Sequence, residues 1–289
     1  MCSFFQPNIV EHFAVEPLSR IAMDDRFVKE INQFFAEIKI QNNVRLVDGK
    51  FGKMCVIKHE PTGKLFVKKS VAIKYVTEIE PMVHQLMKDN RYFIKLYYSL
   101  TTLKSQILIL DYVAGGDLFD FLKKHKKVSE AETRSIVGQL TEALNALHSY
   151  KIIHNDLKLE NVLYVRHKQI YLCDYGLCKI VNTSSCRDGT KEYMSPEKLK
   201  RQNYDVHVDW WALGILTYEL LIGHHPYKHS NDNDEDFDLD VLQQRQQKKL
   251  HKYNFLSSDA QKFLEAMLMY NINYRLCTYE TVIKHSFLS

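Results

Sequence analysis

Residues 150–163 read YKIIHNDLKLENVL, and this stretch is the most specific signal in the chain. It offers a carboxylate at Asp156, a cation at Lys158 and an amide at Asn161 within one short polar loop. An apolar run follows shortly after it and ends in a second carboxylate, Asp174, which precedes a tyrosine and a glycine. The apolar run predicts a buried strand, so that the second carboxylate stands on a turn near the loop.

These four side chains match what phosphoryl transfer requires. The reaction needs a carboxylate that orients the attacking hydroxyl, a cation that neutralises the γ-phosphate, and oxygen ligands for Mg²⁺. We expect Asp156 to orient the hydroxyl and Lys158 to neutralise charge, with Asn161 and Asp174 as the metal ligands. A plain polar loop after a helix would not be expected to carry all four at this spacing.

Two weaker signals lie upstream among short β-like runs. Gly49 and Gly52 fall between two such runs, where glycines let backbone amides approach phosphate oxygens without a Cβ in the way. Lys69 lies on the next predicted strand and could reach the phosphates, while Lys68 would point to the other face. By itself such a glycine pair is more often a turn, and such a lysine is more often a surface charge.

Hydrophobic periodicity divides the chain into a helical beginning, a β-rich part and a larger helical part. Ile31, Phe34 and Ile38 recur at helical spacing, which predicts a helical extension over residues 1–40. A capping box at Ser129 opens a further helix that leads into the polar loop. Strands are predicted at 45–47, 54–58, 64–71, 94–100 and 106–112, and other helices at 76–88, 209–222 and 258–269.

Composition excludes several classes of protein. The net charge of +4 is too mild and too evenly spread to indicate direct nucleic-acid binding. No apolar run approaches the roughly 18 residues of a membrane span, so no membrane partner is expected. The N-terminus lacks the basic region of a secretory signal, and the six scattered cysteines indicate reduced thiols in a cytosolic or nuclear protein.

With these motifs the chain resembles the eukaryotic-type protein kinase family, from about residue 44 to its C-terminus. Three further segments occur in the family's order: LDYVAGGDL at 110–118 resembles the hinge between the lobes, GTKEYMSPE at 189–197 the substrate-docking end of the activation segment, and DWWALG at 209–214 the core helix. Arg275 resembles the arginine that pairs with the glutamate of the activation segment, here Glu197.

The resemblance implies an α+β fold of two lobes. Residues 1–40 would be a helical N-terminal extension, 41–113 the β-rich small lobe with the hinge, and 114–289 the larger helical lobe. It also implies an enzyme that transfers the γ-phosphoryl group of ATP to hydroxyl groups of proteins, with Mg²⁺ or Mn²⁺. The oligomeric state does not follow from it.

The resemblance further implies a nucleotide site between the lobes. Leu110 would be the gatekeeper, the backbone of Asp111 and Val113 would pair with adenine, Asp117 would lie near the ribose, and Lys69 would contact the phosphates. The nucleotide-contacting positions that it implies are Val47, Gly49, Phe51, Gly52, Met54, Val67, Lys69, Leu110, Asp111, Val113, Asp117, Glu160 and Leu163.

In this family the phosphate-binding lysine pairs with a glutamate of the small-lobe helix. Glu80 is the better candidate for the partner of Lys69, because Val83 and Met87 then face the core at helical spacing. Glu78 is the alternative.

The sequence departs from the family at several positions. Val47 replaces the first loop glycine, which predicts weaker closure over the nucleotide, and Val67 replaces an alanine, which narrows the adenine pocket. Tyr175 replaces the phenylalanine after the metal-binding aspartate, which is a mild change. Asn155 replaces the arginine that reads a phosphate on the activation segment, which removes one arm of that phosphate pocket.

Two residues favour serine and threonine over tyrosine as the acceptor. Lys158 follows the catalytic aspartate at the spacing of the serine/threonine class. The resemblance also implies that the hydroxyl of Thr190 contacts Asp156 and Lys158.

The charge of the substrate is a further expectation. Glu160 and Asp117 match positions that meet arginines in basophilic members of the family, and carboxylate–guanidinium pairs are strong and directional. The acidic stretch 231–240, NDNDEDFDLD, would attract cations to the same molecule. We therefore expect a basic protein substrate, although Asp117 could serve only the ribose and the acidic stretch could be only a solvated surface.

The chain is also similar to the baculovirus late serine/threonine kinase group, in its small size, its His-Asn-Asp loop and its helical extension. That similarity implies a viral enzyme that acts on an arginine-rich, DNA-condensing virion protein. It also implies a location in the cytoplasm or nucleus of the host cell, or in the virion.

Two competing interpretations are less favoured. An inactive kinase-like scaffold would be expected to have lost Lys69, Asp156 or Asp174, and all three are present. A small-molecule kinase would lack the 189–197 segment and its partner Arg275, which together dock a polypeptide.

The asparagine at position 155 yields the first prediction: the activity does not require a phosphate on the activation segment. Complete phosphatase treatment should leave the rate of phosphoryl transfer unchanged. A loss of activity after the treatment would contradict the prediction and would point to Thr183, Ser184 or Ser185 as the phosphorylated position.

Overall fold

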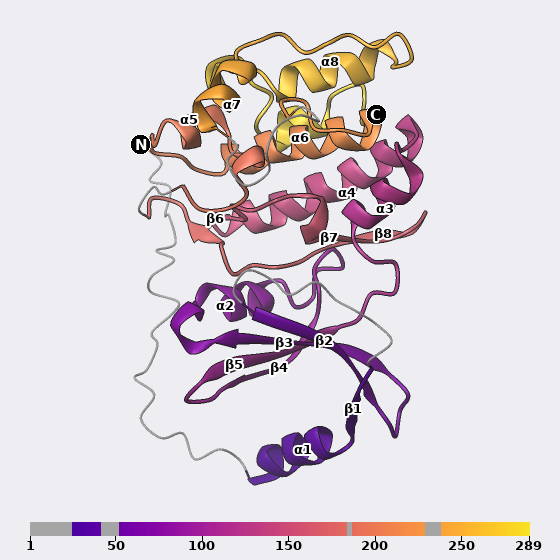
Figure 1. Ribbon diagram of the computed structural model, residues 1–289, viewed down its shortest axis with the longest axis vertical. Helices are drawn as coiled ribbons and strands as arrows, with labels where there is room; N and C mark the ends of the chain where they lie inside the picture. Colours follow the sequence, from indigo (N-terminus) through magenta and orange to yellow (C-terminus); the bar gives the residue numbers. More distant parts are fainter. Residues whose placement is uncertain (1–24, 42–51, 184–186, 229–237) are drawn as a thin grey trace, which may run out of the picture.

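The computed structural model describes residues 25–41, 52–183, 187–228 and 238–289, which form two lobes (Figure 1). The small lobe holds a five-stranded antiparallel sheet in the order β1-β2-β3-β5-β4 and one main helix, α2. The bounds are β1 Ile38–Ile40, β2 Gly52–His59, β3 Leu65–Ala72, the 3₁₀ helix η2 Ile73–Tyr75, α2 Ile79–Leu86, β4 Leu96–Thr101 and β5 Ser105–Asp111. The predicted strand at 45–47 lies outside the described residues.

The register of the sheet determines which side chains share a face of it. β2 and β3 form a hairpin whose turn contains Gly63, at a φ of 69° that glycine adopts without strain. In this hairpin Met54 is opposite Lys69 and Val56 is opposite Val67. Because side chains alternate along a strand, this register fixes the face to which Lys69 points.

The N-terminal extension packs on the sheet at the end of the small lobe that is remote from the helical lobe (Figure 1). Helix α1, Asp25–Ala36, buries Phe34, whose ring lies 5.3 Å from His59, 5.5 Å from Phe66 and 5.0 Å from Tyr98. The helix therefore covers apolar side chains that the sheet would otherwise expose.

The helical prediction for the extension is wrong at its end. The helix stops at Ala36, and Ile38 begins strand β1, which pairs with β2. Ile38 has helical spacing by coincidence, and its cross-strand hydrogen bonds place it in a strand instead. The first strand of the small lobe therefore lies within the range assigned to the extension.

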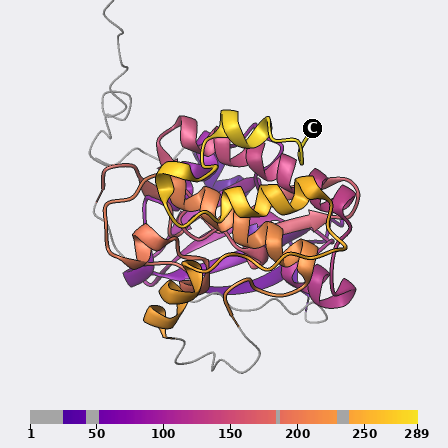
Figure 2. The ribbon, with the colours of Figure 1, turned by 90° about the horizontal axis from the view of Figure 1, so that it is seen from above.

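The large lobe is built mainly of helices, and Figure 2 looks onto them with the sheet behind. Its elements are α3 Leu118–His125, α4 Glu130–Ser149, β6 Ile152–Ile153, η3 Leu159–Asn161, β7 Val162–Val165, β8 Gln169–Leu172, β9 Lys179–Ile180, η4 Lys191–Tyr193, α5 Pro196–Leu199, α6 His207–Ile222, α7 Leu239–Gln246, α8 Ser258–Met267, η5 Ile272–Tyr274 and α9 Tyr279–Ile283.

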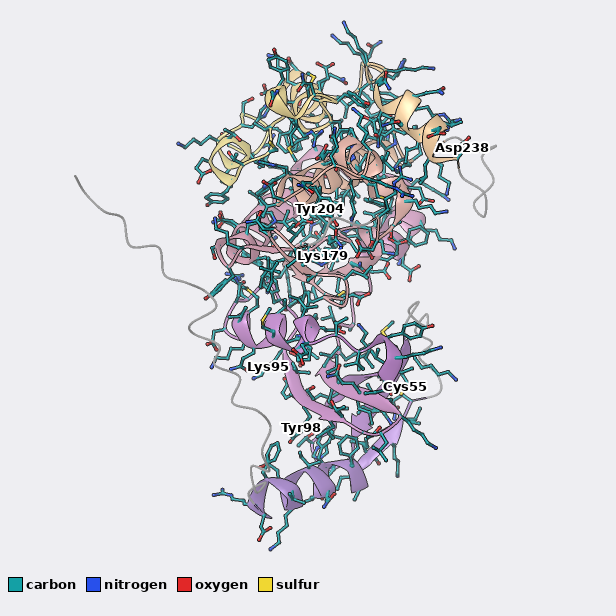
Figure 3. All side chains as sticks on the ribbon, turned by 90° about the vertical axis from the view of Figure 1, so that its left-hand side faces the viewer. Cys55, Lys95, Tyr98, Lys179, Tyr204 and Asp238 are labelled. Carbon is teal, nitrogen blue, oxygen red and sulfur yellow. The ribbon has the colours of Figure 1, made fainter. Side chains whose placement is uncertain are left out.

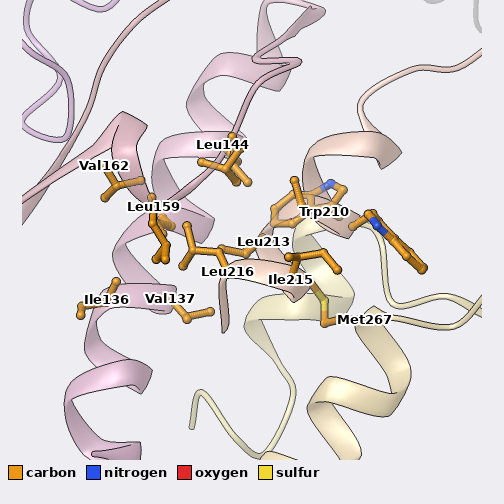
Figure 4. Packing of buried hydrophobic residues seen from close by; sticks show 14 of the residues in the cluster. Ile136, Val137, Leu144, Leu159, Val162, Trp210, Leu213, Ile215, Leu216 and Met267 are labelled. Atoms are coloured by element: carbon orange, nitrogen blue, oxygen red, sulfur yellow. The ribbon is translucent and has the colours of Figure 1, made fainter. Parts of the chain in front are cut away.

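Helix α6 is the centre of this lobe. It is apolar nearly all round, as expected for a buried helix, and it packs against α4 and α8 (Figure 4). Gly214 allows the close approach of α8, because a Cβ there would lie 2.9 Å from the Cβ of Met267 and 2.9 Å from Cδ2 of Leu268.

A buried ion pair fixes the segment that leads into α6. Arg275 donates from Nη1 and Nη2 to the two carboxylate oxygens of Glu197, at 2.8 and 3.0 Å. The guanidinium also lies 4.7 Å from the ring of Trp211. The two residues that the sequence resemblance paired are thus in contact, and the planar, bidentate geometry holds α5 against η5.

The docking of α1 yields a stability prediction. Phe34→Ala removes a ring that is 8% exposed and should lower the free energy of unfolding by about 3 kcal/mol. The matched control is Phe27→Ala on the same helix, where the ring is 44% exposed and the expected loss is below about 0.5 kcal/mol. Urea denaturation measures both, and equal losses would contradict the packing of α1 described above.

Candidate active site

The polar loop between β6 and η3 is held in place from behind by Asp209, in the first turn of α6. The amides of His154 and Asn155 donate to its carboxylate at 2.7 and 2.9 Å, and Nε2 of His148 lies 2.8 Å from it. Burial alone would raise the pKa of Asp209, but His148 and the amides hold it below its ordinary value. The carboxylate therefore stays ionised and fixes the loop backbone.

The front of the loop presents Asp156 with its predicted neighbours around it. Nδ2 of Asn161 donates to the backbone oxygen of Asp156 at 2.7 Å and to Oδ2 at 3.2 Å. Nζ of Lys158 lies 3.8 Å from the same Oδ2. The amide of Thr190 donates to Oδ1 at 2.7 Å, so in the described part of the chain this contact comes from the backbone and not from the hydroxyl that the resemblance implied.

A second group of charges joins the two lobes. Nζ of Lys69, in β3, lies 2.6 Å from Oε1 of Glu80 in α2 and 2.7 Å from Oδ1 of Asp174 in the large lobe. The structure thus pairs Lys69 with Glu80 and not with Glu78. Burial disfavours the ammonium, but Asp174 and Glu80 outweigh it and raise the pKa of Lys69, so the lysine remains a cation.

Asp174 is the exposed member of this group, since about half of its side chain (48%) is accessible to solvent. Burial among protein atoms would raise the pKa of its carboxyl, but Lys69 lowers it below the ordinary value. The following residue, Tyr175, is completely buried and packs edge-on against His84 of α2, with ring centroids 4.7 Å apart. Burial lowers the pKa of His84 to about 4, so a neutral ring fills this contact between the lobes.

The donor set fits Mg²⁺ bound together with a nucleotide. Asn161 uses Nδ2 for the loop, which leaves its amide oxygen for a metal, and Asp174 uses Oδ1 for Lys69, which leaves Oδ2. Within the described ranges no group of three or more His, Cys, Asp or Glu side chains could enclose a metal by itself. Two protein ligands with the remainder from phosphates and water are typical of Mg²⁺ at nucleotide sites.

The remaining nucleotide positions that the structure describes lie in β2, β3 and β5 and at the start of the large lobe. In the sheet Val67 is opposite Leu110, and the chain continues from β5 through Asp111 and Val113 into the large lobe. Asp117 and Leu163 form an isolated bridge where that lobe begins. Gly52 begins β2, whereas Val47, Gly49 and Phe51 lie outside the described residues.

The structure adds charged residues that sequence reasoning missed. Tyr193 donates a hydrogen bond to Glu219 of α6, and Lys228 lies 3.4 Å from Glu192. Burial, with repulsion from Glu160 and Glu192, raises the pKa of Glu219 to about 8. The available signal was a lone carboxylate in the otherwise apolar stretch from 210 to 222.

Comparison with known proteins agrees with this geometry. The family model described as the protein kinase domain matches residues 40–288, and the chain therefore belongs to that family. The predicted two-lobed α+β fold is confirmed by this match and by a solved structure of the same fold.

Similar proteins narrow the class further. The chain is 99% identical over 267 residues to serine/threonine-protein kinase 1 of Heliothis zea nuclear polyhedrosis virus, across 92% of this chain and 100% of that protein. It is 43% identical to the protein of the same name from Lymantria dispar multicapsid nuclear polyhedrosis virus, across 91% and 96%. The structure of the Cydia pomonella granulovirus kinase PK-1 matches at 36% identity with a TM-score of 0.84, across 92% of this chain and 100% of that one.

These findings confirm the predicted enzyme class and the resemblance to baculovirus kinases: the chain is a serine/threonine protein kinase. Members of this family act on proteins and generally use ATP with Mg²⁺. The described part of the chain contains no helix with the length and hydropathy to cross a membrane.

The site geometry predicts the effect of removing its charges. Asp174→Asn should lower the rate of γ-phosphoryl transfer by several powers of ten, where each tenfold step is about 1.4 kcal/mol of barrier, because it removes the negative charge that pairs with Lys69 and that would be available to Mg²⁺. Lys69→Met should act chiefly by misplacing the phosphates. The control is Asp89→Asn at an exposed position of the small lobe. A comparable loss of rate in that variant would show that the effect is not specific to Asp174.

Proposed function

We propose that this kinase transfers the γ-phosphoryl group of ATP to serine and threonine hydroxyls of basic, arginine-rich proteins, with Mg²⁺ or Mn²⁺ as the metal. In this proposal Asp156 orients the acceptor hydroxyl and Lys158 neutralises charge on the γ-phosphate. Asn161 and Asp174 hold the metal, and Lys69 holds the phosphates in line. The chemistry is mostly positioning and charge neutralisation, as is general for phosphoryl transfer.

The acidic group Glu160, Glu192 and Glu219 is the observation that carries the substrate preference. It lies between the catalytic loop, the activation segment and α6, and mutual repulsion contributes to the raised pKa of Glu219. A guanidinium placed among these carboxylates would relieve that repulsion and form charge-assisted hydrogen bonds.

Asp117 extends this acidic surface toward the hinge. Burial and, more weakly, the neighbouring Asp120 and Glu160 raise the pKa of its carboxyl. Its Oδ1 accepts from the amide of Asp120 at 2.8 Å and so caps α3. In the proposal the same carboxyl group also contacts the ribose or an arginine of the substrate. The acidic stretch 231–240, of which residues 231–237 lie outside the described part, adds negative charge in the sequence.

The similarity to baculovirus kinases supports a wider proposal about the setting. The enzyme would act late in infection, in the cytoplasm or nucleus of the host cell or in the virion, on an arginine-rich protein that condenses DNA. Imaging of the tagged protein through an infection time course tests this setting independently of the enzymology.

Two serine peptides of equal length, one arginine-rich and one acidic, test the substrate class. The arginine-rich peptide should take up labelled γ-phosphate in the presence of Mg²⁺, and Asp174→Asn should abolish the label. Labelling of the acidic peptide would leave the enzyme class intact and would overturn the roles given to Asp117, Glu160 and Glu219.

The pKa of Glu219 gives the same proposal a pH signature. Because this pKa is raised to about 8, the carboxylate becomes ionised as the pH rises through that value, and arginine stays charged throughout. The KM for the arginine-rich peptide should therefore fall between pH 7 and pH 9 in the wild type. The dependence should disappear in Glu219→Gln, and a persistent slope in that variant would refute the assignment.

A further inference from the structure

One side chain behind the catalytic loop connects several segments of the large lobe. Asn155 has a φ of 70°, in the left-handed region that asparagine tolerates better than most residues. Its Nδ2 donates to the backbone oxygen of Leu177 at 2.9 Å and to Oδ1 of Asp188 at 3.2 Å. Its Oδ1 accepts from Nζ of Lys198 at 2.6 Å and from the hydroxyl of Tyr204 at 3.2 Å.

The cation of this network is buried. Lys198, in α5, is 3% exposed, and its Nζ also donates to the backbone oxygen of Asn155 at 3.0 Å. Burial lowers the pKa of Lys198, and the carboxylates of Asp188, Asp209 and Asp156 oppose that shift. A buried ammonium is tolerated only with such compensation, so the loop and the segment around it must keep this arrangement.

The anion of the network ties the activation segment to the strand in front of the catalytic loop. Oδ2 of Asp188 lies 2.9 Å from Nζ of Lys179 in β9, which pairs with β6. Nζ of Lys179 also donates to the hydroxyl of Tyr204 at 3.4 Å, and the two side chains lie close together in Figure 3. Asp188 thus meets Lys179 on one oxygen and Asn155 on the other.

The two residues after Asp188 connect the position of the activation segment to that of the catalytic aspartate, Asp156. Gly189 has a φ of 99°, and a Cβ there would lie 2.7 Å from the backbone oxygen of Asn155 and 3.2 Å from Oδ1 of Asp156. The next residue, Thr190, is the one whose amide donates to that Oδ1. The backbone of the activation segment therefore packs directly on the loop, and its placement sets a hydrogen bond to Asp156.

We propose that Asp188 and Lys198 are positioning residues for phosphoryl transfer, which hold the activation segment against the catalytic loop with permanent side-chain charges. Asp188 supplies, next to Lys179, the negative charge that a phosphorylated activation segment would supply. Lys198, in α5, places a cation next to Asn155, where the family would have the arginine of the loop itself. The inference rests on the kinase activity and is independent of the preference for basic substrates.

The decisive variant is Asp188→Asn, which removes the charge and keeps the shape. All proteins are treated to completion with phosphatase, and ATP hydrolysis without any peptide is measured, which separates this test from the choice of substrate. The kcat of Asp188→Asn should fall at least about tenfold with little change in the KM for ATP. Asp188→Glu should recover part of the loss, and Asp89→Asn should match the wild type.

Lys198→Met tests the buried cation, with Lys200→Met at an exposed position of the same short segment as its control. Lys198→Met should lower kcat and leave the KM for ATP unchanged, whereas the control should do neither. Where Lys198→Met fails to fold, as seen by thermal unfolding, the Asp188 pair of variants decides alone. Wild-type kcat in phosphatase-treated Asp188→Asn, or a wild-type enzyme that phosphatase inactivates, would overturn the proposal.

Discussion

Asp209 connects the hydrophobic core of the large lobe to the loop that carries the chemistry. Its carboxylate stands at the N-terminal end of α6, where a negative charge is favoured, and it accepts the amides of His154 and Asn155. At His154 and Asn155 the loop is therefore held through its backbone amides, whatever side chains these positions carry. That explains how Asn155 can occupy a position that the family gives to arginine while Asp156, the next residue, keeps its orientation.

The two lobes meet through the charges around Lys69 and through apolar packing around Tyr175. Lys69 touches a carboxylate from each lobe, and Tyr175 fills the space under α2 next to the neutral His84. Because the lysine is buried and charged, separation of the lobes would take Asp174 away from it and leave Glu80 as its one carboxylate among these two, which is costly. The closed arrangement is therefore favoured by the same residues that place the phosphates.

The central site could be predicted because its residues stand at short, ordered spacings, and the two-lobed fold was implied by the family resemblance that these motifs carry. Asp156, Lys158 and Asn161 share one loop, and Asp174 ends the strand that follows it. The choice between Glu80 and Glu78 stayed open, because helical spacing distinguishes two nearby residues only when the start of the helix is known.

Other features could not be predicted, because they depend on contacts between distant parts of the chain. Strand β1 exists through its pairing with β2, and Lys198 meets Asn155 only once α5 is folded against the loop. The predicted capping box at Ser129 is half formed: the serine accepts from the amide of Glu132, whose carboxylate instead accepts from the hydroxyl of Tyr164. A sequence pattern can thus suggest one hydrogen-bond partner for a side chain, while the tertiary structure provides a different one.

The carboxylates of Glu160, Glu192 and Glu219 also bear on how the reaction ends. A phosphoserine carries about two negative charges at neutral pH, so on a basic substrate of the proposed kind each turnover would convert a cationic stretch into one that is less cationic. Under that proposal the product would be attracted more weakly to the same acidic group than the substrate was, and its release would be faster. Serines beside an existing phosphate become poorer acceptors for the same reason, so a surface that gathers arginines would space the phosphates along its substrate.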